Sequence, residues 1–262
     1  MKRIWIKDAV IINENREFRG SVLIQGDKIE QIYEGDLYDR MINISDEIID
    51  ASGKWLIPGV IDDQVHFREP GLTYKADIHS ESMAAAAGGI TSYMEMPNTV
   101  PQTTTIDALE WKFERAARTS VVNYSFYIGA NNDNLAELKK INPKRICGVK
   151  VFMGSSTGNM LVNNTRTLEN IFREISSVIA VHCEKEEIIK ANREMYVSRF
   201  GEDLPVMFHP LIRSAEACYA SSAQAVELAS RNIHIWSLTS FIASFAISSL
   251  ASLFSRARSW NR

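Results

Sequence analysis

The sequence predicts an α/β fold in which a small β-domain precedes a parallel sheet or barrel, and two patterns indicate it. Residues 1–56 read as short strands separated by turns, which is typical of a small β-domain. From residue 57 onward, short apolar runs alternate with helical stretches, which is the pattern of βαβα units. With 262 residues the chain is long enough for a barrel with a small appendage.

The small β-domain is expected to span residues 1–56. Apolar alternation and the Gly26-Asp27 turn predict strands at 4–6, 9–12, 21–25 and 29–33.

The second part, residues 57–237, contains the expected barrel elements. Strands are predicted at 57–66, 90–94, 121–128, 148–153, 178–182 and 233–237, with helices at 78–87, 107–119, 168–175, 184–200 and 214–230. A closed TIM-type barrel needs eight strands and carries its active site at their C-terminal ends. We therefore predict an incomplete (β/α) barrel.

The last part, residues 238–262, differs in composition from the rest. No Asp or Glu follows Glu227, and the segment is rich in Ser, Phe, Ala and Arg. Three readings compete: an amphipathic or membrane-adsorbing helix, a divergent terminal helix, or out-of-frame translation of a truncated gene. We favour the third. Recurrent serines interrupt any apolar span and so argue against the membrane reading.

Composition narrows the class of partner. The net charge of -3, with 45% hydrophobic and 23% charged residues, gives no reason to expect nucleic acid or a membrane as partner, so a small molecule is the better expectation. Cys147, Cys183 and Cys218 match neither a disulfide framework nor a Cys-x-x-Cys motif. The N-terminus has no sustained apolar stretch, so we predict a cytoplasmic protein.

The stretch 61–71 is the most informative for chemistry. In an extended strand Asp62, Gln64 and His66 share one face, and Arg68 follows where a guanidinium could reach a carboxylate. For an isolated Gln-x-His, an edge strand with one partly satisfied histidine would be the simpler reading. The residues on either side, 58–62 and 66–71, favour a different reading.

These flanks resemble the first barrel strand of the cyclic amidohydrolases, and most closely that of dihydroorotase. Further segments resemble dihydroorotase in family order, over roughly residues 1–235: 95–99, 148–158, 180–184 and 209–214. The resemblance implies a metal-dependent hydrolase barrel that opens the cyclic amide of dihydroorotate to N-carbamoyl-aspartate, reversibly, in pyrimidine biosynthesis.

The resemblance also implies a metal site. His66, Lys150, His182 and Gln64 match ligand positions, and zinc suits such donors. In the intact family member two zinc ions would be bridged by carboxylated Lys150. The alternative for Lys150 is a lysine whose charge reaches the surface, although its position between two valines favours an inward side chain.

Two further residues match family positions that hold the substrate carboxylate, Arg68 and Asn98. Asn98 could equally be a turn residue beside Pro97.

The chain departs from the family in three places. Gln64 stands where many relatives have a histidine, and Ser237 stands where the sixth strand should supply a ligand histidine. His234 could replace that histidine, but it lies three residues from Ser237 and therefore on the opposite face of the strand. The late Asp-His motif that supplies the proton-transfer base is absent, so the catalytic base is unknown and an inactive chain is one expectation.

Two other functions stay open. Another cyclic amidohydrolase, such as allantoinase or dihydropyrimidinase, shares the barrel and lysine, although Arg68 favours a carboxylated substrate. A non-catalytic dihydroorotase-like interaction module fits the missing ligands. A homo-oligomer also remains open.

Overall fold

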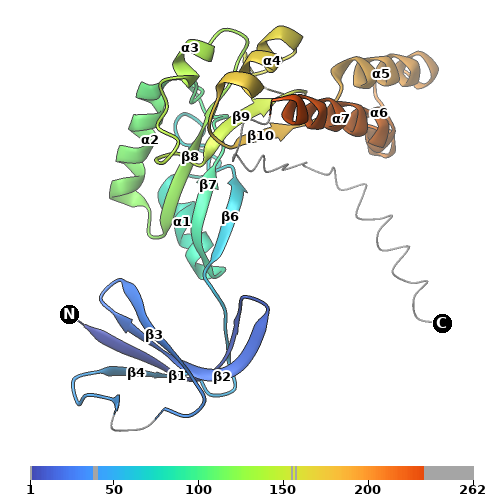
Figure 1. Ribbon diagram of the computed structural model, residues 1–262. Coiled ribbons are helices and arrows are strands. Elements are labelled where there is room, and N and C mark those ends of the chain that lie inside the picture. The colour runs from blue at the N-terminus through green and yellow to red at the C-terminus, as the bar shows by residue number, and fades with distance from the viewer. Residues whose placement is uncertain (1, 38–40, 155, 157, 233–262) are drawn as a thin grey trace, which may run out of the picture. The chain divides into compact units, whose positions relative to one another are not determined.

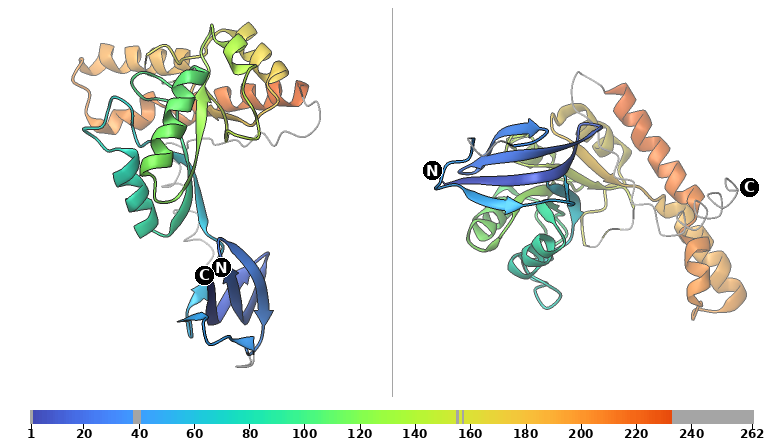
Figure 2. Two further views of the ribbon diagram at one scale, coloured as in Figure 1. Left: turned by 90° about the vertical axis from the view of Figure 1, so that its left-hand side faces the viewer. Right: turned by 90° about the horizontal axis from the view of Figure 1, so that it is seen from below.

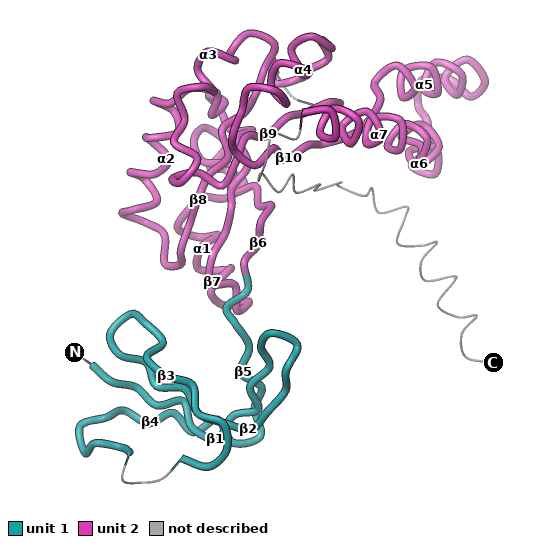
Figure 3. The backbone as a smooth tube through the Cα atoms, in the orientation of Figure 1, with its two compact units in different colours: residues 1–60 teal, residues 61–262 magenta. Residues whose placement is uncertain are grey.

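The computed structural model describes residues 2–37, 41–154, 156 and 158–232. Contacts divide the chain into two compact units, Met1–Val60 and Ile61–Arg262 (Figure 3). The strand expected at 233–237 and the tail 238–262 lie outside the described residues.

The first unit is a five-stranded sheet in the order β3-β2-β1-β4, with β5 also paired to β1. Its strands are β1 (Arg3–Asn13), β2 (Arg16–Gln25), β3 (Lys28–Glu34), β4 (Glu47–Asp50) and β5 (Trp55–Leu56). The two strands expected at 4–6 and 9–12 form the single strand β1, with a register shift between Ile6 and Ala9. The residue at this irregularity, Asp8, has a φ of 62°.

The sequence did not predict β4. Its side chains are exposed, and its pairing is parallel to β1, more than thirty residues earlier in the chain. Local alternation cannot reveal a strand whose stabilising partner is so distant.

The second unit contains a five-stranded sheet in the order β10-β9-β8-β7-β6 (Figures 1 and 2). Its strands are β6 (Val60–Val65), β7 (Ile90–Glu95), β8 (Asn123–Gly129), β9 (Gly148–Phe152) and β10 (Ile179–His182). The ladders β7–β8, β8–β9 and β9–β10 are parallel. The predicted incomplete (β/α) barrel is therefore confirmed as a curled half-barrel of parallel strands.

Helices connect or follow these strands, and polar side chains fix where several of them begin. The helices are α1 (Ile78–Ala87), α2 (Ile106–Thr119), α3 (Leu135–Leu138), α4 (Thr165–Glu174), α5 (Glu186–Phe200), α6 (His209–Ile212) and α7 (Ala215–Arg231). Helix α4 begins earlier than expected because the Asn164 side chain accepts from the Thr167 backbone N–H. None of the described helices combines the length and apolarity that a membrane crossing requires.

The hydrophobic core lies between one face of this sheet and the helices. On this face Val65, Phe67, Val149, Val151 and Val181 pack with apolar side chains of α1, α2, α4 and α7 in one buried cluster. Because side chains alternate along a strand, the intervening residues face the opposite, concave side of the sheet. Those residues include Gln64, His66, Lys150 and His182.

Candidate functional site

The ends of β6 and β7 meet at a hydrogen-bonded group of polar side chains. His66 follows the last residue of β6, and its Nδ1 lies 2.8 Å from Asn98 Oδ1. The guanidinium of Arg68 donates to the Asn98 carbonyl oxygen at 3.2 Å. The structure therefore brings three of the residues singled out in the sequence together, from two neighbouring strands.

Burial and nearby positive charges both act on the His66 ring. Burial of part of the ring, then the positive charges of Arg68, Lys150 and Lys112, lower the pKa of His66 from 6.5 to about 4. The hydrogen bond to Asn98 opposes this shift. At neutral pH the ring is uncharged, and an uncharged imidazole is the form that can ligate a metal.

Lys150 lies on β9, and its side chain is buried. Burial lowers the pKa of its amine to about 8. Nζ lies 5.2 Å from the centroid of the Phe152 ring, and no described carboxylate forms an ion pair with it. A buried lysine without an acidic partner exists in part as the neutral amine, which is nucleophilic.

His182 ends β10 and belongs to a chain of polar contacts. Its Nε2 lies 2.8 Å from Glu184 Oε2, and Arg213 Nε donates to Glu184 Oε1 at 2.8 Å. The Arg213 side chain comes from the turn before α7, where Ser214 caps the helix. This arrangement holds the ring through Nε2 and leaves Nδ1 as the nitrogen for any ligand.

Gln64 completes the set of predicted ligand positions. Its Oε1 is buried, and no hydrogen-bond partner for it exists among the described residues. A buried polar atom without a partner costs free energy, so an unsatisfied amide oxygen on this face fits a site that a cation would complete.

The donor chemistry therefore fits a metal ion: two imidazoles, a lysine amine and an amide oxygen share the concave face. Within residues 2–37, 41–154, 156 and 158–232, however, no group of three or more His, Cys, Asp or Glu side chains is placed to hold an ion. Any centre built here thus depends on Lys150 and Gln64 as well as the histidines.

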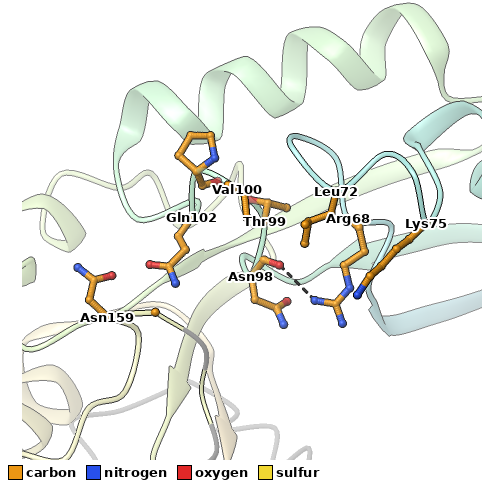
Figure 4. Close-up of a pocket in the computed structure, with 10 residues that line it drawn as sticks. Arg68, Leu72, Lys75, Asn98, Thr99, Val100, Gln102 and Asn159 are labelled. Carbon is orange, nitrogen blue, oxygen red and sulfur yellow. Dashed lines mark hydrogen bonds between the residues drawn. The ribbon is translucent and has the colours of Figure 1, made fainter.

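A pocket of about 670 Å³ opens beside this group (Figure 4). Its lining is contributed by three loops and consists of Arg68, Leu72, Lys75, Asn98, Thr99, Val100, Pro101, Gln102, Gly158 and Asn159. No acidic side chain is among them, so the pocket favours an anion.

The sequence reasoning missed the ion pair beneath the site. Glu95 at the end of β7 and Lys112 on α2 are fully buried, with Lys112 Nζ 2.6 Å from Glu95 Oε2. The other carboxylate oxygen, Oε1, accepts from the Arg68 backbone N–H at 3.1 Å, so the pair fixes the loop that carries Arg68. The sequence signal for this pair was Lys112 itself, which lies among the buried positions of the amphipathic helix α2.

The titration of His66 gives a first prediction. In the chelator-treated protein, NMR of the imidazole should show His66 still uncharged at pH 6, where an ordinary histidine is largely protonated. Because the folded-state pKa is depressed, the unfolded chain binds the proton first, and acidification from pH 6.5 towards 4 should lower the free energy of unfolding. A His66→Gln variant should lose that component. A midpoint near 6.5 would contradict the proposed surroundings of the ring.

Comparison with solved structures defines the class of protein. The L-hydantoinase (dihydropyrimidinase) from Arthrobacter aurescens superposes with a TM-score of 0.81 at 29% identity, over 88% of this chain and 51% of that chain. A D-hydantoinase at 24% identity has a TM-score of 0.72 and shares the fold. The half-barrel and its small N-terminal sheet are therefore those of the cyclic amidohydrolases.

Comparison of sequences specifies the family. The Dihydro-orotase-like family profile matches residues 53–205. A dihydroorotase from Methanosarcina acetivorans is 34% identical over 239 residues, covering 88% of this chain and 48% of the relative. An L-hydantoinase from Paenarthrobacter aurescens is 33% identical over 207 residues, covering 77% of this chain and 44% of that relative. The chain belongs to the dihydroorotase-like family, and it spans about half the length of these curated relatives.

Proposed function

We propose that this chain carries the substrate-binding and metal-binding half of a dihydroorotase, which hydrolyses the ring amide of dihydroorotate to N-carbamoyl-aspartate. The observation that carries the proposal is the Arg68 guanidinium, which lines a pocket without acidic residues and lies against Asn98, the hydrogen-bond partner of His66. A cation at that place can hold a substrate carboxylate while the ring lies beside the imidazole.

His66, His182, Lys150 and Gln64 would hold the metal, which we propose is zinc, with Lys150 serving in its carboxylated form. Zinc, when bound, supplies Lewis acidity to the ring amide carbonyl and lowers the pKa of water. Asn98 holds the His66 ring through Nδ1, and Glu184 holds His182 through Nε2, so both rings keep a fixed tautomer. We assign the proton-transfer step to no described residue.

Glu184→Gln tests the contact behind His182. A glutamine keeps the size of the side chain but removes the charge that Arg213 and His182 both contact. Loss of such an outer contact typically weakens metal binding by about 10- to 100-fold. Zinc titration should show that loss, whereas Glu187→Gln, on the exposed side of α5, should leave the affinity unchanged. Equal affinities in both variants would remove Glu184 from the site.

Ligand binding by the chain separates dihydroorotase from its alternatives. We expect equilibrium titration to show tighter binding of dihydroorotate than of dihydrouracil, hydantoin or allantoin, because only dihydroorotate carries a carboxylate for Arg68. A preference for hydantoin would favour the second candidate, a hydantoinase, which the similarity to the L-hydantoinase supports.

A non-catalytic interaction module is the third possibility. It predicts a stable chain that binds neither zinc nor any of the four rings.

A further inference from the structure

A second cation lies in the pocket beside Arg68, and it has no assigned role. Lys75 lines the same pocket as Arg68, Asn98 and Gln102. Figure 4 shows the side chains of Lys75 and Arg68 directed toward the same side of the pocket. The chain therefore places two positive charges where one ligand can contact both.

Two hydrogen-bonded turns produce this placement. The Leu72 N–H donates to the Arg68 carbonyl oxygen at 3.1 Å, and the Lys75 N–H donates to the Leu72 carbonyl oxygen at 2.9 Å. These turns bring the chain back after Arg68, so that a residue seven positions later returns to the pocket wall.

The loop that carries both cations is held against the loop after β7. The Val100 N–H donates to the Pro70 carbonyl oxygen at 3.1 Å. A Cβ on Gly71 would lie only 1.9 Å from the Val100 carbonyl oxygen, so the two backbones are in close contact. The backbone of the loop that carries Lys75 is therefore held in place, although the Lys75 side chain is exposed.

Neither charge is compensated within the described part of the chain. No Asp or Glu lines the pocket, and neither Arg68 nor Lys75 forms an ion pair with a described carboxylate. Lys75 Nζ lies 5.8 Å from the centroid of the Tyr74 ring, a contact that leaves the charge in place. Two adjacent positive charges repel each other, and an anion bound between them relieves that repulsion.

We propose that Lys75 is a specificity-determining residue that, with Arg68, selects cyclic ureides bearing a carboxylate over uncharged rings. This inference rests on the proposed function, because it assumes that the pocket is the substrate site. It adds a residue that the sequence reasoning did not single out. It also distinguishes a dihydroorotate site from a site for a neutral ring such as hydantoin or dihydrouracil.

Dihydroorotate and dihydrouracil make a matched pair of probes, because they differ by the carboxylate. We expect Lys75→Met to weaken the binding of dihydroorotate to the full chain by about tenfold, the value of one charge-assisted contact, and to leave dihydrouracil unchanged. The variant should also show a smaller loss of dihydroorotate affinity when salt is added. Lys75→Arg keeps the charge and should restore most of the affinity.

Two controls separate this inference from the proposed function. Lys190→Met removes an exposed lysine from α5 and should change nothing. Arg68→Met should reduce dihydroorotate binding. If it does so while Lys75→Met binds like the unaltered chain, the inference is overturned and the proposed function stands. If the unaltered chain binds dihydroorotate no better than dihydrouracil, or binds neither, both are overturned.

Discussion

Replacing Lys112 by methionine is expected to lower the free energy of unfolding by about 3–5 kcal/mol, the cost of leaving one partner of a buried ion pair alone. Lys112 and Glu95 are both fully buried, and Nζ also donates to the Met96 carbonyl oxygen at 3.2 Å. Nζ also lies 4.8 Å from the centroid of the Phe126 ring, and neither side chain of the pair is exposed to solvent. Urea denaturation measures the change.

The pH dependence of the stability of the Lys112→Met variant should show that the charge left unpaired is that of Glu95. Burial already raises the pKa of Glu95, although Lys112 opposes the shift. Without Lys112 the folded-state pKa should rise further above the unfolded value. The variant should then be least impaired at low pH, where Glu95 is protonated, and lose stability as the pH rises through the folded-state pKa.

Two further variants control this measurement. Glu95→Gln combined with Lys112→Met removes both charges while keeping an acceptor for the Arg68 N–H, and should recover much of the loss. Lys139→Met breaks the Lys139–Glu174 pair, which is exposed on the lysine side, and should change stability by less than about 1 kcal/mol. A loss at Lys112 no larger than at Lys139 would show that the buried pair does not stabilise the loop.

Replacing Gly71 by alanine is expected to produce the second large effect, on both stability and binding. Gly71 has a φ of 84°, and its new Cβ would meet the Val100 carbonyl oxygen at 1.9 Å. The contact is with backbone, so the Arg68 loop and the Asn98 loop must separate. We expect a loss of at least about 2 kcal/mol of stability, together with weaker dihydroorotate binding.

Gly89 provides a matched control for this substitution. It also has a positive φ, 83°, but a Cβ there would meet nothing within 4 Å. Gly89→Ala should therefore show only the conformational cost of about 1 kcal/mol and leave ligand binding unchanged. Equal effects of the two substitutions in denaturation and titration would mean that the contact between the loops does not shape the pocket.

The sequence allowed prediction of the elements whose stabilising pattern is local. The amphipathic helix expected at 107–119 and the buried strand expected at 148–153 carry their pattern within a few residues, and both lie close to where they were expected. The alternation of side chains along a strand also predicted that Gln64, His66 and Lys150 face away from the valines that pack in the core.

What the sequence did not reveal depends on distant partners. The short helix α3 and the strand β4 have no sustained pattern of their own. The pairing of Glu95 with Lys112 joins residues on different elements, and each could have been a surface charge in isolation. Lys75 reaches the pocket only because two turns reverse the chain after Arg68.

Zinc binding by the purified chain tests the proposed metal centre on the concave face, at the ends of β6, β9 and β10. Zinc content should be measured after dialysis for the unaltered chain, for Lys150→Met and for the double variant His66→Ala/His182→Ala, with folding checked by circular dichroism. We expect bound zinc in the unaltered chain and a marked loss in both folded variants. A folded chain without zinc, or variants that retain it fully, would rule out a metal centre at these residues.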